Sequence, residues 1–142
     1  MGEKVLFVCI HNSGRSQMAE AFLKVLGGDR FEVESAGLDP GRLNPIVVEA
    51  MREAGIDIST NRTKSIQDVL KGRKTFDLLI TVCDETSAER CPTVPGSGQR
   101  IHWDFEDPAS FKGSSEEKLK KTRAVRDKIK KTIQEWLKKE YE

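Results

Sequence analysis

The sequence of 142 residues has neither a charge excess nor a long apolar run. Its 24 lysines and arginines nearly balance 23 aspartates and glutamates, which leaves a formal net charge of +1. The basic excess typical of nucleic-acid-binding proteins is therefore missing. No apolar run approaches the roughly 20 residues of a membrane span, and the N-terminal run is too short for a signal peptide. We expect neither a nucleic-acid partner nor attachment to a membrane.

Cysteine is scarce, with three in the chain: Cys9, Cys83 and Cys91. An odd count without an export signal favours a reducing compartment, in which thiols are catalytic or redox-active rather than structural. Histidine and cysteine form no cluster with the spacing of a zinc site. The sequence therefore predicts a cytoplasmic protein that holds no metal and no cofactor.

What the chain does have is an alternation of strand and helix patterns. The predicted strands are Lys4–Val8, Phe31–Ser35, Phe76–Val82 and Arg100–Trp103. The predicted helices are Ser16–Leu26, a segment from Asn44-Pro45 to Gly55, Ser65–Leu70, and a last helix that begins at Ser114. This order predicts a single α/β domain over residues 1–142. It is a small doubly wound domain, with a central four-stranded parallel sheet and helices on both faces.

One octapeptide joins the first predicted strand to the first predicted helix: Cys9, Ile10, His11, Asn12, Ser13, Gly14, Arg15 and Ser16. A short loop that leads into a helix N-terminus directs successive backbone N–H groups inward and forms a cup for a tetrahedral anion. Arg15 adds a planar cation that can bind two oxygens at once. The same field favours the thiolate form of Cys9, and Ser16 can hydrogen-bond the sulfur. The octapeptide predicts a cysteine nucleophile in an oxyanion-binding loop.

Three residues of this loop have other features. Asn12 tolerates a left-handed backbone, and its amide can tie the loop to its neighbours. Gly14 suits a close backbone approach. A lone loop histidine such as His11 is more often neither a base nor a metal ligand, so we assign it no direct chemical role.

Attack on a tetrahedral oxyanion also requires a proton for the leaving oxygen. Asp107 is the candidate acid, because Pro108 restricts the residue before it and so helps to fix the direction of the carboxyl group. On this evidence alone, its neighbours Asp104 and Glu106 remain alternatives.

The octapeptide and its continuation Gln17-Met18-Ala19-Glu20 resemble the phosphate-binding loop and first helix of the low-molecular-weight protein tyrosine phosphatase superfamily. Within that superfamily the chain is most similar to the thioredoxin-coupled arsenate reductases. The resemblance runs from Val5 to about Phe111 and includes Ser35-Ala36-Gly37 and Asp107-Pro108.

The resemblance implies that Asp107 is the general acid. The phosphatases of this superfamily typically place aromatic residues after the proline, where this chain has Ala109-Ser110. A site without that wall suits a small inorganic anion, such as arsenate or its mimics phosphate and sulfate, better than an aryl ester.

The resemblance further implies that the three cysteines act in series. Cys83 would attack the sulfur of the arsenate adduct on Cys9, which releases arsenite and leaves a Cys9–Cys83 disulfide. Cys91 would then attack Cys83, and thioredoxin would reduce the Cys83–Cys91 disulfide. If the residues between them are helical, about 12 Å separates Cys83 from Cys91, too far for a disulfide. We therefore expect this segment to unwind when the bond forms.

Some members of the family have a potassium site near the loop. Asn12, Glu20 and Ser35 match three of its positions, but Ser65 stands where those members have an aspartate. We interpret Asn12, Glu20 and Ser35 as a network that braces the loop.

The leading hypothesis is a monomeric arsenate reductase. The first alternative is a phosphatase for phosphotyrosine or a small phosphomonoester that uses Cys9, Arg15 and Asp107, with Cys83 and Cys91 as bystanders. The second alternative is a non-enzymatic oxyanion or redox sensor.

Overall fold

The computed structural model describes residues 2–71, 75–82 and 98–141. Its elements, in chain order, are β1 (Glu3–Cys9), α1 (Arg15–Gly27), η1 (Gly28–Arg30), β2 (Phe31–Gly37), α2 (Pro45–Glu53), α3 (Ile66–Leu70), β3 (Leu78–Thr81), β4 (Gln99–His102), η3 (Pro108–Ser110) and α4 (Ser115–Tyr141). Each predicted strand and helix is present, with bounds that differ by a few residues.

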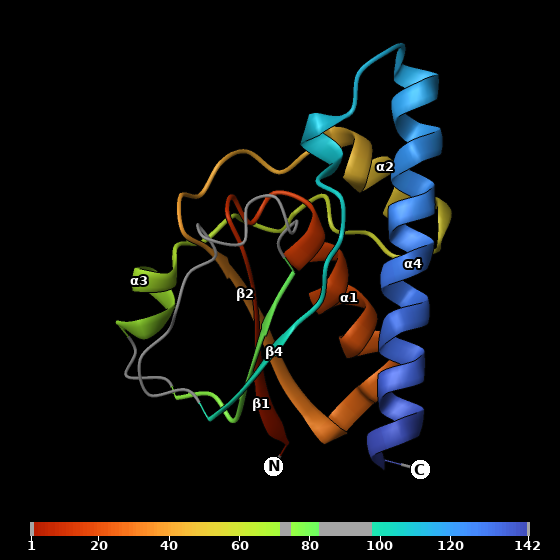
Figure 1. Cartoon of the computed structure of the whole chain (residues 1–142). Helices are drawn as coiled ribbons and strands as arrows, with labels where there is room; N and C mark the ends of the chain where they lie inside the picture. Colours follow the sequence, from red (N-terminus) through yellow and green to blue (C-terminus); the bar gives the residue numbers. More distant parts are fainter. Residues whose placement is uncertain (1, 72–74, 83–97, 142) are drawn as a thin grey trace.

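The four strands form one parallel sheet in the order β2-β1-β3-β4. Helices α1, α2 and α4 cover one face, and the short helix α3 lies on the other (Figure 1). The predicted four-stranded parallel sheet with helices on both faces is therefore confirmed.

Strand β1 is one of the two inner strands and supplies side chains to two hydrophobic cores. Val5, Phe7 and Cys9 belong to the core shared with α1 and α4, whereas Leu6 and Val8 face the core under α3. Successive side chains of a strand point to opposite faces, so a continuous apolar run is what a strand buried on both sides requires.

Helix α4 packs along α1 and α2 through one apolar stripe. Val125, Ile129, Ile133 and Leu137 recur every fourth residue and are buried. Its start has a capping box, in which Glu117 N donates to Ser114 Oγ at 3.2 Å and Ser114 N donates to Glu117 Oε1 at 3.4 Å. Within the described ranges, no helix combines the length and apolar character needed to cross a lipid bilayer.

Two arginines of α4 connect it to α2. Arg123 forms a two-pronged ion pair with Glu53, with both N···O distances at 2.7 Å. Arg126 Nη1 donates to the carbonyl oxygen of Ala50 at 2.8 Å. The contacts set the position of α2 against the long helix.

The order of the strands also sets where a ligand can bind. From β1 the chain passes to β2 on one side and then to β3 on the other side of β1. In open parallel sheets, ligands bind beyond the carboxyl ends of the strands at such a reversal. Cys9, the last residue of β1, lies at this position.

Candidate active site

The sulfur of Cys9 is buried and hydrogen-bonded to two residues of the loop. The residue is 2% exposed, its Sγ lies 2.9 Å from Ser16 Oγ, and Asn12 N donates to it at 3.1 Å. The Asn12 N–H and the Ser16 hydroxyl together hold the Cys9 sulfur at the start of the loop.

Asn12 is the residue that shapes the loop. It adopts φ of 54°, the left-handed region that asparagine tolerates. Its side-chain Nδ2 donates to Ser16 Oγ at 2.8 Å, and its Oδ1 accepts from Lys64 N at 2.9 Å. Gly14, by contrast, has φ of −148°, so the left-handed turn of the loop is at Asn12.

The backbone of residues 38–44 runs alongside the loop and donates hydrogen bonds to the carbonyl oxygens of the loop. Leu38 N donates to Cys9 O, Asp39 N to Ile10 O, Gly41 N to His11 O, and Asn44 N to Ser13 O, at distances from 2.8 to 3.2 Å. In a trans peptide, the carbonyl of one residue and the N–H of the next point in opposite directions. The N–H groups that follow these carbonyls therefore point away from the segment, as that of Asn12 does toward Cys9 Sγ. An anion cup in this loop would require such an arrangement of N–H groups.

The side chain of His11 also bonds the segment of residues 38–44. Its Nδ1 lies 2.8 Å from the carbonyl oxygen of Asp39. The carbonyl can only accept, so Nδ1 is the protonated nitrogen. His11 thus helps to fasten the loop to its neighbouring segment.

Gly37, at the end of β2, allows β2 to lie close to the backbone of the loop. A Cβ atom at this position would lie 2.8 Å from both Asn12 N and Ile10 O. Both are backbone atoms, which a side chain cannot displace without moving the loop.

Arg15 connects the loop to the predicted acid. It is 3% exposed, its Nη1 donates to Phe105 O at 3.1 Å, and its Nη2 lies 3.4 Å from Asp107 Oδ2. The other carboxylate oxygen of Asp107 accepts from Ala109 N at 3.0 Å and caps η3. Glu106, in contrast, lines a cavity against α4. The structure thus brings Asp107 to the loop.

Gln17 is a loop-holding residue that the sequence analysis did not single out. It is 1% exposed, and its Nε2 donates to the backbone oxygens of Asn12 and Arg62, both at 3.1 Å. Its Oε1 accepts from Asn61 Nδ2 at 3.1 Å. The only sequence signal for it is its place directly after the octapeptide.

The predicted bracing network divides into two groups. Asn12 bonds Ser16, Gln17 and Lys64, whereas Glu20 accepts from Ser35 Oγ on one oxygen and pairs with Lys24 Nζ on the other, each at 2.6 Å. Lys24 was not predicted.

Both oxygens of Glu20 are thus engaged by a hydroxyl and an ammonium, so these residues do not fit a potassium ion. Ser65 caps α3 through its hydroxyl, which accepts from Asp68 N at 2.9 Å. Among the residues that the structure describes, no cluster of histidine, cysteine, aspartate and glutamate could hold a metal.

Cys83 and Cys91 lie outside the described residues, as do the segment between them and the disulfides predicted for them.

Comparisons with known proteins find similar sequences over most of the chain. The sequence profile of a family described as "Low molecular weight phosphotyrosine protein phosphatase" matches residues 4–141. An arsenate reductase of Halalkalibacterium halodurans is 44% identical over 134 residues, which cover 94% of each chain.

Solved structures of arsenate reductases are also similar to this chain. A structure titled "An arsenate reductase in the phosphate binding state" aligns with a TM-score of 0.77 and 32% identity, over 96% of this chain and 98% of the other. A thioredoxin-dependent arsenate reductase of Corynebacterium glutamicum aligns with a TM-score of 0.60 and 32% identity, over 94% of this chain and 62% of the other.

Proposed function

Because this chain belongs to the low-molecular-weight phosphotyrosine protein phosphatase family, we propose that it is an enzyme of the arsenate reductase branch, which converts arsenate to arsenite. The observation that carries the proposal is the Cys9 sulfur, which is buried and accepts a hydrogen bond from the backbone N–H of Asn12, in the loop that leads to Arg15. The choice of arsenate over a phosphate ester is supported by the names of the relatives, by Ala109-Ser110, and by the two further cysteines.

The first step uses the cup. The Cys9 thiolate attacks the arsenic atom, and an As–O bond breaks as the oxygen leaves as water. Arg15 and the N–H groups of the loop hold the remaining oxygens and stabilise the charge that develops on them. Asp107 would supply the proton, and its pairing with Arg15 at 3.4 Å supports this role.

The second step reduces the arsenic. The Cys83 thiolate attacks Cys9 Sγ, the S–As bond breaks, and its electron pair stays on arsenic, which leaves as arsenite. The product on the protein is a Cys9–Cys83 disulfide. Cys91 then attacks Cys83 and frees the Cys9 thiolate.

The third step returns the electrons. A thioredoxin dithiol reduces the Cys83–Cys91 disulfide, so one arsenate and one dithiol give one arsenite, one water and one thioredoxin disulfide. The thioredoxin-dependent neighbour supports this donor. The cycle requires reduced thiols, which places the enzyme in the cytoplasm.

The test is arsenite production with thioredoxin, thioredoxin reductase and NADPH, beside a glutathione–glutaredoxin control. The Cys83→Ser variant should lose multiple-turnover reduction but keep any hydrolysis of p-nitrophenyl phosphate, which would use Cys9, Arg15 and Asp107 but not Cys83. If Cys83→Ser reduces arsenate as fast as the parent, the relay is wrong.

A residual phosphatase activity is the second candidate. The Arg15–Asp107 pair beside Cys9 offers the same nucleophile, anion clamp and acid that a phosphomonoester requires. Hydrolysis of p-nitrophenyl phosphate that disappears in Cys9→Ser would support this activity. Hydrolysis that survives in Cys9→Ser would contradict it.

A further inference from the structure

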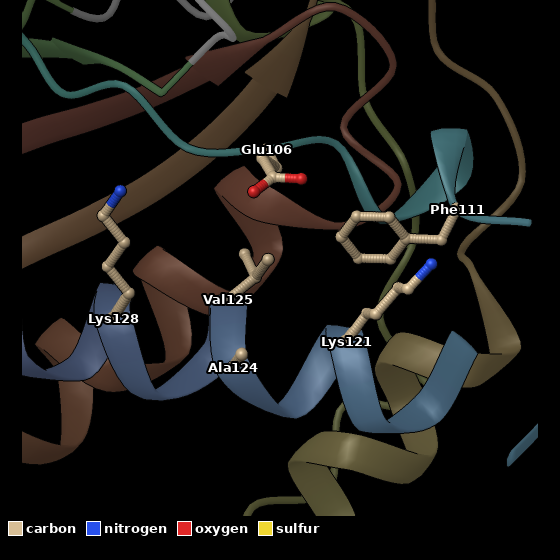
Figure 2. Close-up of a pocket in the computed structure, with 6 residues that line it drawn as sticks. All are labelled: Glu106, Phe111, Lys121, Ala124, Val125 and Lys128. Atoms are coloured by element: carbon tan, nitrogen blue, oxygen red, sulfur yellow. The ribbon is translucent and has the colours of Figure 1, made fainter. Parts of the chain in front are cut away.

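A cavity of about 360 Å³ lies between α4 and the segment that carries Asp107. Figure 2 shows the residues that line it, which are Glu106, Phe111, Lys121, Ala124, Val125 and Lys128. A volume of this order is within the range of small-molecule sites, roughly 300–1,000 Å³. None of these six residues takes part in the arsenate chemistry proposed above.

The floor of the cavity is apolar. Val125 is buried, Phe111 is half-buried, and Ala124 completes the surface between the two charged ends. Apolar surface of this kind favours a ligand whose own apolar surface it removes from water.

Two ammonium groups flank this floor. Lys121 and Lys128 are seven residues apart on α4, so their Cα atoms are separated by about 10 Å along the helix. The Lys121 ammonium lies 5.9 Å from the centre of the Phe111 ring, and the Lys128 ammonium lies 5.9 Å from that of Phe105. Figure 2 shows the Glu106 carboxylate between the two lysines, over Val125.

The charges select a class of ligand. Two ammonium groups and one carboxylate leave a local excess of one positive charge, which favours a monoanion. The apolar floor favours a ligand with an aromatic or aliphatic body. Glu106 disfavours a second negative charge near the middle of the ligand.

We propose that this cavity binds a small organic monoanion with an apolar body, such as an arylalkyl carboxylate, and that its occupancy adjusts the segment that carries Asp107. The cavity and Asp107 are coupled because two residues that line the cavity flank Asp107 and η3 along the chain. Glu106 directly precedes Asp107, and Phe111 ends the single turn η3 that the Asp107 side chain caps. A ligand held between these two residues and α4 restrains both ends of the segment that carries Asp107.

The binding arm uses 4-phenylbutyrate, titrated into the full chain by isothermal calorimetry. We expect saturable binding that acetate and 4-phenylbutanol do not match, because each lacks one half of the recognised chemistry. Lys121→Gln and Lys128→Gln should each weaken binding about two- to fivefold, and Glu106→Gln should strengthen it by a similar factor. Lys131→Gln, on the same helix and outside the cavity, is the matched control and should leave the affinity unchanged.

The lysine variants and Glu106→Gln are expected to change the affinity in opposite directions, so a general loss of binding cannot account for both. Affinity that is unchanged in both lysine variants, or an absence of binding, would overturn the site. Circular dichroism of each variant checks that α4 is intact.

The coupling arm measures arsenate turnover and p-nitrophenyl phosphate hydrolysis with and without saturating 4-phenylbutyrate. We expect a change in kcat that the Lys121→Gln/Lys128→Gln double variant loses. Binding without any change in kcat would overturn the coupling. Because the binding arm uses no arsenate, failure of the proposed reductase activity and failure of this site are distinguishable.

Discussion

Arg15 shows how one side chain can join two parts of the site. Its guanidinium bonds the carbonyl of Phe105 and the carboxylate of Asp107, ninety positions away in the case of Phe105. A lysine keeps the charge but has no planar fork to hold both partners and the oxyanion.

We therefore expect Arg15→Lys to lower kcat/KM for arsenate by about 10²-fold or more, the magnitude seen when one stabiliser of a developing oxyanion is removed. Steady-state kinetics with thioredoxin measure the change. Arg126→Lys is the control, because Arg126 also bonds a backbone carbonyl but in the α2–α4 contact. A loss for Arg15→Lys no larger than that of the control would contradict the assignment.

Asn12 combines backbone conformation with hydrogen bonding, and two substitutions separate these contributions. Asn12→Gly keeps the left-handed backbone but loses the amide contacts to Ser16 and Lys64, whereas Asn12→Ala loses both. We expect Asn12→Ala to be less stable than Asn12→Gly by about 1 kcal/mol, the usual cost of a Cβ in the left-handed region. Urea unfolding measures the difference, and equal stability of the two variants would show that the conformation costs nothing.

At the scale of elements, local patterns were enough to predict the four strands and the four α-helices of the described residues, and capping residues located several of the ends. Asn44 and Ser65 each accept a backbone N–H at the start of a helix, as their positions indicated. The contacts of the candidate site were harder to predict. Phe105 and Arg62 contribute only backbone carbonyls, and a carbonyl leaves no signal in the residue type. Such partners depend on which segments the fold brings together.

The contact between α2 and α4 predicts a pH dependence. The hydrogen bonds that Arg123 donates lower the pKa of Glu53 from its ordinary value of 4.5. A carboxyl whose pKa is lower in the folded chain stabilises the fold above its unfolded pKa. That stability is lost as the pH falls through the folded pKa. We expect the parent to be more stable than Glu53→Gln at pH 7, with the difference shrinking below about pH 4.5.

Thermal unfolding from pH 7 to pH 3 measures this difference. Glu135→Gln is the control, because its lysine partner on α4 is 4.0 Å away and both side chains are largely exposed. A difference between the parent and Glu53→Gln that is constant over the whole range would exclude the ion pair as its source.

At the scale of the whole molecule, the alternation of elements predicted the doubly wound sheet, but not the order β2-β1-β3-β4. Strand order depends on long-range packing, which periodicity does not report. The order matters because it places the end of β1, and with it Cys9, at the reversal, where we propose that the anion binds.

An anion that binds only the folded cup should stabilise the entire chain. At a phosphate concentration of 100 times its Kd, the expected gain is about 2.7 kcal/mol, or about 5–10 °C in Tm for a chain of this size. Differential scanning fluorimetry with potassium chloride at equal ionic strength as the control measures it. Arg15→Lys should lose most of the shift, and an equal shift in that variant would mean that phosphate binds elsewhere.

The approach of Gly37 to the loop has a consequence for evolution. Its Cβ position is filled by the backbone of Ile10 and Asn12, so every substitution there displaces the cup. In a library of single substitutions selected for growth on arsenate, position 37 should be depleted as strongly as position 9, although no substituent at Gly37 takes part in the chemistry. Position 9 would then be constrained by reactivity and position 37 by space, and both positions would vary equally little among the descendants of this chain.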